Sequence, residues 1–248
     1  MTFFRDIIVW KGKKCGRKKT MLKFKEDLIL FLVKTGALKF GEFTTKSGRQ
    51  SPYFINAGCF MSGEHIETLG NFYADCIMDA KSEKDDFDIL FGPAYKGIPL
   101  CISAACALYR KYNINKQYCF NRKEAKNHGE GGIFVGASLS DGDRVAIIED
   151  VVSAGTQTRE IVPLIKSHAD VELKDMFILV DRLEVGYNGK TAPQEIKEEF
   201  GINVHPIVDV REIIDFLYNR EIGGDVILGE ERRDKMERYL KIYCAVSV

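Results

Sequence analysis

The chain has 248 residues, 45% hydrophobic and 29% charged, which is the composition of an ordinary globular protein with a sizeable core. Its 36 Lys and Arg residues balance 36 Asp and Glu residues, so the net charge is zero and the composition gives no sign of nucleic-acid binding. Seven cysteines without a C-x-x-C pair, no secretory signal and no apolar run near ~18 residues predict a cytoplasmic protein without a thiolate metal site or a membrane span.

Basic residues are concentrated in the first twenty positions. Seven Lys and Arg residues against Asp6 alone give residues 1–20 a charge of 7 − 1 = +6, which leaves 0 − 6 = −6 for the remaining chain. This extension is either a targeting or surface-binding piece, or a segment without function ahead of Met21. We expect a single domain over residues 21–248.

The first predicted elements are a helix and a pair of short strands. Apolar residues recur at helical spacing after Thr20, and Gly36 is a suitable stop for that helix. Residues 38–57 are predicted to form two strands around the turn 47–49, with Pro52 at the start of the second strand. A helix over 62–80 follows, with Ser62 as its N-cap.

Beyond residue 86, short apolar strands alternate with helices. Strands are predicted at 87–91, 118–120, 144–148, 176–180 and 204–208, and helices at 98–112, 156–168, 210–219 and about 230–243. This alternation favours an α/β fold whose parallel sheet is covered by helices on both faces. Residues 121–132 interrupt it with three glycines and no large apolar anchor, so they are predicted to form a lid or binding loop.

Residues 145–158 carry the most functional information. A buried strand is predicted to end at the acidic pair Glu149-Asp150, and the small residues of 153–156 then open a helix. Ligands of open α/β sheets bind at the carboxyl ends of strands, where backbone N–H groups of such a turn can surround a phosphate. The carboxylates would repel a second phosphate and suit sugar hydroxyls or phosphate-bound Mg²⁺. The alternative is an ordinary turn whose acidic residues face solvent.

Three other segments carry candidate binding residues. Residues 92–97 form a Gly-Pro turn between a strand and a helix, where Lys96 could contact a pyrophosphate at the same sheet edge. Residues 121–132 carry three cations and a histidine on the predicted lid, which could close over a departing pyrophosphate. Residues 46–58 place Lys46 beside an aromatic strand, which could bind a flat anionic ring. Each of the three could equally be solvated surface or simple turn structure.

Together the four segments resemble the orotate phosphoribosyltransferases, a group within the type I phosphoribosyltransferases. The order is K-S-G-R-x-S-P-Y-F-x-N-A-G at 46–58, G-P-A-Y-K-G at 92–97, N-R-K-E-A-K-x-H-G-E-G-G at 121–132, and the acidic pair with its loop. The resemblance spans about residues 22–216. Glu149 stands where many members have Asp, and Ser153 where Thr is frequent; both changes keep the functional group.

The resemblance implies a fold, a reaction and an assembly. The fold is a central, mostly parallel sheet flanked by helices, with a small hood formed by about 21–60 and part of 183–215. The reaction transfers ribose 5-phosphate from phosphoribosyl pyrophosphate to N1 of orotate, giving orotidine 5′-monophosphate and pyrophosphate. The implied cofactor is Mg²⁺, held mainly through phosphoribosyl pyrophosphate without a dedicated set of protein ligands. The implied assembly is a homodimer in which each lid serves the neighbouring subunit's site, with no nucleic-acid or membrane partner.

The resemblance also assigns roles to residues of this chain. The catalytic group comprises Lys126, His128 and Asp150. Phosphoribosyl pyrophosphate is assigned to Tyr95, Lys96, Arg122, Lys123, Lys126, His128, Glu149, Asp150, Val151, Val152, Ser153, Ala154, Gly155 and Thr156. Orotate is assigned to Lys46, Phe54, Ile55, Ser153 and Arg182. The physical reason for Arg182 is that a guanidinium binds a carboxylate bidentately.

Two alternatives share the acidic-pair motif. A purine-type phosphoribosyltransferase would not need the Lys46 hairpin or the lid between Arg122 and His128. A regulator that binds phosphoribosyl pyrophosphate without catalysis would keep the phosphate-binding turn and lose the lid cations. Because the hairpin and the lid cations are both present, the orotate enzyme is the preferred hypothesis.

Overall fold

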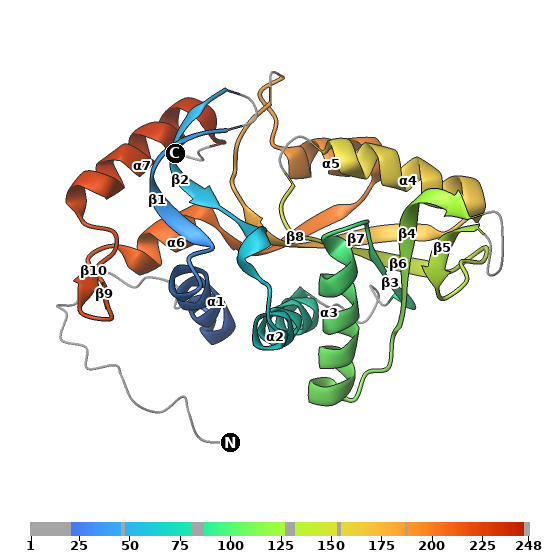
Figure 1. Cartoon of the computed structure of the whole chain (residues 1–248). Coiled ribbons are helices and arrows are strands. Elements are labelled where there is room, and N and C mark those ends of the chain that lie inside the picture. Colours follow the sequence, from blue (N-terminus) through green and yellow to red (C-terminus); the bar gives the residue numbers. More distant parts are fainter. Residues whose placement is uncertain are drawn as a thin grey trace.

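A six-stranded sheet forms the centre of the computed structural model in Figure 1, which describes residues 21–45, 48–80, 87–126, 132–152, 155–186 and 188–245. The strand order is β5-β4-β3-β6-β7-β8, and neighbours are parallel except that β5 runs antiparallel to β4. The mostly parallel α/β sheet is therefore confirmed. The strands are β3 (Ile89–Gly92), β4 (Gln117–Lys126), β5 (Gly132–Gly136), β6 (Arg144–Glu149), β7 (Glu172–Asp181) and β8 (Asn203–Asp209).

Helices cover both faces of the sheet because its central strands are apolar on both sides. In β6, Ile148 points into a core with one set of helices, and Ile147 points into a second core on the opposite face. The first core contains α1 (Lys23–Lys34), α2 (Gly63–Ala80), α3 (Gly97–Tyr112) and α6 (Val210–Leu217); the second contains α4 (Thr156–His168) and α5 (Ala192–Phe200). Figure 1 shows these two helical layers below and above the sheet.

Between β3 and β6 the direction in which successive strands are added to the sheet reverses. The chain passes from β3 through α3 to β4 on one side, and from β6 through α4 to β7 on the other. The two crossover helices lie on opposite faces, so their N-terminal ends leave a crevice between the carboxyl ends of β3 and β6. Such a switch point is where open α/β sheets bind ligands. The segments 92–97 and 149–156 therefore meet at one edge.

A second, smaller layer is built from distant parts of the chain at one end of the sheet (Figure 1). β1 (Leu38–Thr44) pairs antiparallel with β2 (Gln50–Ile55), and β2 packs against α7 (Glu230–Tyr243). Within 183–215, the segment around Glu184 joins this layer through a bridge to Cys244, whereas β8 lies in the large sheet. Three short elements complete the fold: η1 (Ala57–Cys59), β9 (Glu221–Ile222) and β10 (Asp225–Val226).

The predicted loop at 121–132 is wrong for its first half. Residues 121–126 continue β4, and β5 returns antiparallel beside it from Gly132. The sequence shows no strand pattern here because this hairpin lies at the sheet edge. There, paired backbone groups rather than buried side chains stabilise the strands. The predicted N-cap of α2 is confirmed, since the backbone N–H of His65 donates to Ser62 Oγ at 3.2 Å.

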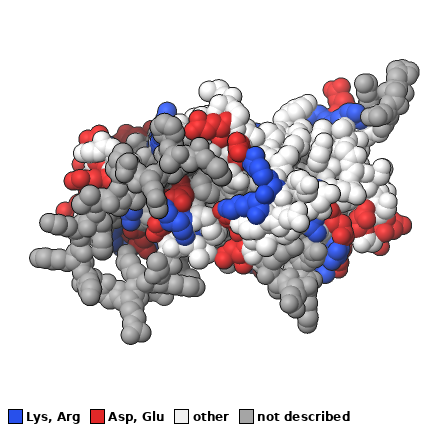
Figure 2. Space-filling model, turned by 90° about the horizontal axis from the view of Figure 1, so that it is seen from below, with Lys and Arg blue, Asp and Glu red and all other residues white. Residues whose placement is uncertain are grey.

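No helix in the described ranges combines the length and hydrophobicity needed to cross a membrane. Figure 2, seen from below, shows acidic and basic side chains interspersed on the visible part of that face. This mixed distribution gives no support to a nucleic-acid surface there, since such a surface is expected to gather Lys and Arg. The extension 1–20 lies outside the described residues.

Candidate active site

The loop between β3 and α3 is held tightly by two glycines. A Cβ atom on Gly92 would lie 2.4 Å from the carbonyl oxygen of Gly97, and one on Gly97 would lie 2.9 Å from the carbonyl oxygen of Ile148. Both distances are shorter than non-bonded atoms allow, so the strand, the loop and the helix can approach this closely only without side chains. Lys96 is thereby placed against the end of β6. The peptide between Ala94 and Tyr95 is cis.

Two polar side chains from other elements anchor the backbone of this loop. Asn121, buried at the end of the sheet-paired part of β4, accepts a hydrogen bond from Ala94 N–H at 2.9 Å. Gln157, in the first turn of α4, donates to the Ala94 carbonyl oxygen at 3.5 Å. Both residues were missed by the sequence interpretation. Asn121 is the first residue of the 121–132 motif and Gln157 lies in the segment 145–158, but the sequence interpretation gave neither of them a role.

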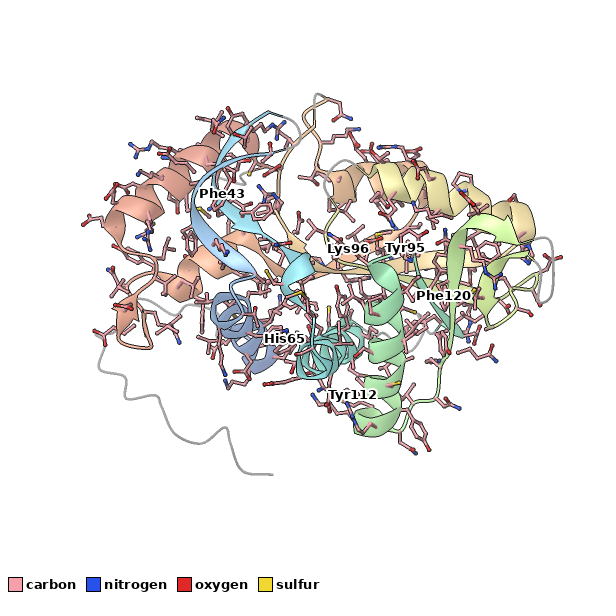
Figure 3. The ribbon with its side chains drawn as sticks, in the orientation of Figure 1. Phe43, His65, Tyr95, Lys96, Tyr112 and Phe120 are labelled. Carbon is pink, nitrogen blue, oxygen red and sulfur yellow. The ribbon has the colours of Figure 1, made fainter. Side chains whose placement is uncertain are left out.

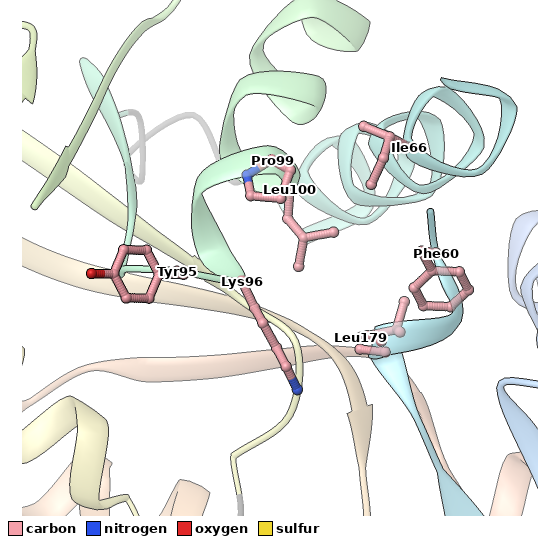
Figure 4. A pocket seen from close by; sticks show the side chains of 9 residues that line it. Phe60, Ile66, Tyr95, Lys96, Pro99, Leu100 and Leu179 are labelled. Carbon is pink, nitrogen blue, oxygen red and sulfur yellow. The ribbon is translucent and has the colours of Figure 1, made fainter. Parts of the chain in front are cut away.

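Lys96 and Asp150 form the contact that joins the two predicted motifs. Lys96 Nζ lies 3.0 Å from Asp150 Oδ2, with the lysine side chain 63% exposed and the aspartate 13% exposed. Figure 3 places Tyr95 and Lys96 together at the start of α3. The two side chains point in different directions in Figure 4, and Lys96 extends away from Pro99 and Leu100. An ammonium and a carboxylate thus meet at the switch point of the sheet.

Glu149 is the buried member of the acidic pair. Its backbone oxygen accepts a hydrogen bond from the buried Tyr73 hydroxyl at 2.7 Å, which fixes the end of β6. Burial raises the pKa of Glu149, and the adjacent Asp150 carboxylate raises it further. Asp150 is fixed by its own backbone, because Val151 N–H donates to Asp150 Oδ1 at 2.7 Å. The pair therefore consists of a carboxyl that readily holds a proton and a carboxylate compensated by Lys96.

The predicted phosphate-binding turn is described in part. Gly155 has φ +67°, a left-handed conformation that favours glycine, and it precedes α4, which begins at Thr156. The N-terminal N–H groups of α4 therefore open toward the carboxyl end of β6. Val152 is buried and Val151 is partly buried. Ser153 and Ala154 lie outside the described residues.

The predicted lid cations lie on the β4–β5 hairpin. Arg122 Nη1 donates to the carbonyl oxygen of Gly132 at 3.0 Å, and Lys123 is exposed. The backbone of Lys126 pairs with Gly132, but its side chain is not described, and His128 lies outside the described residues. The structure therefore places the start of the lid next to Asn121, which anchors the β3–α3 loop.

The predicted orotate residues are divided between the small layer and the end of β7. Phe54 is 43% exposed and stacks on Phe43 at a ring distance of 5.4 Å, and Ile55 packs against the larger core. Arg182 directly follows β7 and is largely buried, with its guanidinium 4.3 Å from the centre of the Tyr53 ring. Lys46 lies outside the described residues.

A cavity of about 270 Å³ adjoins Lys96 between η1, α2, α3 and β7 (Figure 4). Its walls are mostly apolar, with Phe60, Ile66, Leu100 and Leu179 facing the same space. No group of three or more His, Cys, Asp or Glu side chains among the described residues is arranged to hold a metal ion. The site thus offers carboxylates, an ammonium and open helix N–H groups for a phosphorylated sugar.

An acidic pair at the end of β6, opposite a lysine from the β3–α3 loop in a mostly parallel sheet, defines the class of the type I phosphoribosyltransferases. No family model matches the chain. The chain is 48% identical over 223 residues to the orotate phosphoribosyltransferase of Clostridium acetobutylicum, covering 90% of this chain and 99% of that protein. The corresponding protein of Clostridium beijerinckii is 45% identical over 225 residues, covering 91% and 100%.

A solved structure agrees with these sequence relatives. The crystal structure of orotate phosphoribosyltransferase from Francisella tularensis superposes with a TM-score of 0.75 at 36% identity, covering 88% of this chain and all of that one. The chain belongs to the orotate phosphoribosyltransferase family.

Proposed function

We propose that the chain transfers the ribose 5-phosphate group of phosphoribosyl pyrophosphate to N1 of orotate, forming orotidine 5′-monophosphate and pyrophosphate for pyrimidine (UMP) biosynthesis. The observation that carries the proposal is the Lys96–Asp150 contact at the switch point, which unites the loop for pyrophosphate with the loop for the ribose. Family membership supplies orotate as the acceptor.

The reaction breaks the bond between C1 of the ribose and the pyrophosphate oxygen, and forms a bond from C1 to N1 of orotate, whose proton leaves. Positive charge develops on the ribose ring while negative charge grows on the pyrophosphate. Asp150 and Glu149 can hydrogen-bond the ribose hydroxyls, and the Asp150 carboxylate can stabilise the ring charge, because both residues lie at the end of β6 beside the open N-terminus of α4. The backbone of 153–156 takes the 5-phosphate.

The departing pyrophosphate is assigned to the cationic groups on the opposite side of the crevice. Tyr95 and Lys96 form the rigid part, since their loop is fixed by Asn121. Arg122, Lys123 and Lys126 follow that asparagine in β4, and His128 supplies a hydrogen bond or a proton. Lys96 contacts Asp150 at the switch point, and its other N–H donors remain for the pyrophosphate.

Orotate is assigned to the space between the small layer and the end of β7. We propose that the small layer acts as the hood and that Lys46, Phe54, Ile55, Ser153 and Arg182 hold the ring. Phe54 supports this role because it is a large exposed aromatic residue held by a ring partner.

The Asp150 carboxylate oxygens are the ligand type that Mg²⁺ takes, so this site fits the cofactor. Bound mainly to phosphoribosyl pyrophosphate, Mg²⁺ would neutralise charge on the leaving group. A cytoplasmic location is supported by six free cysteines in the described residues, which suit a reducing compartment.

The activity is tested by adding phosphoribosyl pyrophosphate and Mg²⁺ to the purified protein with orotate, hypoxanthine, adenine or uracil. We expect the orotate absorbance to fall, no turnover of the other three bases, and loss of the reaction when Mg²⁺ is chelated. Equal turnover of a purine base would contradict the orotate assignment and leave only the wider class.

The homodimer with shared lids is proposed from the family resemblance, and mixing of variants tests it. Lys126→Ala removes the lid cation. Asp150→Ala removes a carboxylate of the segment 149–156, which binds the ribose 5-phosphate and is called the cradle here. Each variant alone should be nearly inactive. Random pairing makes about half of the dimers mixed, and each mixed dimer joins one intact lid to one intact cradle, so recovery of about a quarter of the native activity is expected. No recovery after verified subunit exchange would show that each lid serves its own subunit.

A further inference from the structure

We propose that Glu184 is the residue that positions Arg182 for the carboxylate of orotate, and that Tyr239 of α7 in turn positions Glu184. This inference rests on the proposed function, because it assigns Arg182 to the acceptor. It makes the helix α7, more than fifty positions away in sequence, a determinant of acceptor affinity.

A tight turn after β7 brings Glu184 back toward Arg182. Leu183 has φ +56°, which is unusual for a residue with a side chain, and its N–H donates to Asp181 Oδ1 at 2.8 Å. The segment is then fastened from outside, since Val185 N–H donates to the Tyr243 carbonyl oxygen at 2.8 Å and Ala245 N–H donates to that of Leu183 at 2.9 Å. The strained conformation is therefore imposed by its surroundings, as at sites where geometry matters.

The guanidinium of Arg182 is fixed along one edge. Its Nε and Nη2 donate to Glu184 Oε1 at 2.8 and 2.5 Å, and Nη2 also donates to Ser51 Oγ at 3.3 Å. The Tyr53 ring lies against its face at 4.3 Å. Nη1 is held by neither Glu184 nor Ser51, so we assign it to the ligand, with the Tyr239 hydroxyl also beside the guanidinium. Glu184 thus decides which edge of the guanidinium is presented.

Glu184 accepts a hydrogen bond from Tyr239 and also contacts a second arginine, Arg49. The Tyr239 hydroxyl donates to Glu184 Oε1 at 2.7 Å, and burial together with this hydrogen bond raises the pKa of Tyr239 to about 12, so the hydroxyl keeps its proton. Arg49 Nη1 lies 3.9 Å from Glu184 Oε2, and Arg49 Nη2 donates to the Val185 carbonyl oxygen at 2.8 Å.

Two guanidiniums therefore share one carboxylate in a region where Arg182 and Glu184 are only 11% and 14% exposed. These three side chains carry +2 − 1 = +1, with Asp181 as the next carboxyl in the sequence and in the turn. A carboxylate on the ligand would give Arg182 a second charged partner in this partly buried region. Orotate carries such a group and uracil does not, which agrees with an acceptor site selective for the acid.

The test measures the steady-state constants of Glu184→Ala, Glu184→Gln and Tyr239→Phe. Glu184→Ala is expected to raise the KM for orotate by about tenfold or more, because a charge-assisted anchor is lost. The KM for phosphoribosyl pyrophosphate and kcat at saturating orotate should change by less than about twofold. Glu184→Gln keeps an acceptor for Arg182, so it should restore part of the affinity.

Tyr239→Phe is the mild variant, and it remains informative if Glu184→Ala does not fold. It is expected to raise the KM for orotate about threefold through loss of one hydrogen bond to Glu184. Because Tyr239 acts mainly through Glu184, with a weaker contact to Arg182 itself, adding Tyr239→Phe to Glu184→Ala should raise the KM by less than the threefold expected in the native background.

Asp88→Ala is the matched control. It breaks another arginine–carboxylate pair, with Arg144 Nη2 at 2.7 Å, at the amino ends of β3 and β6, away from the acceptor site. This variant should leave the orotate KM unchanged. An unchanged or lowered orotate KM in Glu184→Ala or in Tyr239→Phe, or an equal rise in both substrate KM values, would overturn the positioning role. If the native protein itself does not consume orotate, the proposed function fails instead.

Discussion

Asp150→Asn is expected to lower kcat by on the order of a hundredfold or more, with a melting temperature near that of the native chain. The amide fits the same space and can still accept the hydrogen bond from Val151 N–H. It cannot supply the negative charge that faces Lys96 in the free enzyme and the ribose ring in the transition state. Single-turnover kinetics at saturating substrate measures the chemical step directly.

Asp88→Asn provides the comparison for Asp150→Asn, since it neutralises a carboxylate paired with Arg144 at the opposite edge of the sheet. We expect its kcat to stay within about twofold of the native value. A normal kcat in Asp150→Asn would mean that the Lys96–Asp150 pair only stabilises the fold, and the acidic pair would lose its assigned role.

Gly92→Ala is the second substitution with a large expected effect. Its Cβ would lie 2.4 Å from the carbonyl oxygen of Gly97 and 2.6 Å from Cys101 Cβ, so either β3 or α3 must shift. Overpacking of this kind costs about 1–3 kcal/mol of unfolding free energy, and contact with backbone atoms places it at the upper end or beyond. Thermal unfolding should show a lower melting temperature, and kcat should fall as well because Lys96 moves with the loop.

Gly63→Ala is the control for this substitution. A Cβ on Gly63, at the start of α2, would meet no atom within 4 Å. Alanine is also a better helix former than glycine, so this variant should be as stable as the native chain or slightly more stable. If Gly92→Ala unfolded at the native temperature with native activity, the close packing of the β3–α3 loop would not be what positions Lys96.

The hydrophobic pattern predicted most of the large sheet because its strands are buried on both faces. Val145–Ile148 and Met176–Val180 are continuous apolar runs, and each lies within an observed strand. α5 was not predicted, since it buries only Ala192 and Ile196 over nine residues. A capping box at Thr191 and Gln194 was the local signal that could have identified it.

The candidate site, too, could be predicted only in part from the sequence. The loops of 92–97 and 149–156 could be predicted because each motif is continuous in sequence and its place at a strand end follows from the fold. Asn121, Gln157 and Glu184 could not, since their roles depend on which distant backbone or side chain each one reaches. Such contacts are set by packing across the sheet, for which a single sequence carries no local signal.

The cluster around Arg182 has a consequence for the order in which the chain folds. Arg182 meets Ser51 across 131 positions of sequence, and Arg49 meets Val185 across 136. Contacts this distant are slow to form, because the entropy of closing the intervening chain must be lost before they contribute. The sheet core, joined by shorter crossovers, should therefore gain protection from hydrogen exchange first. Refolding chains would then acquire their phosphate-binding turn before their selectivity for the acceptor base.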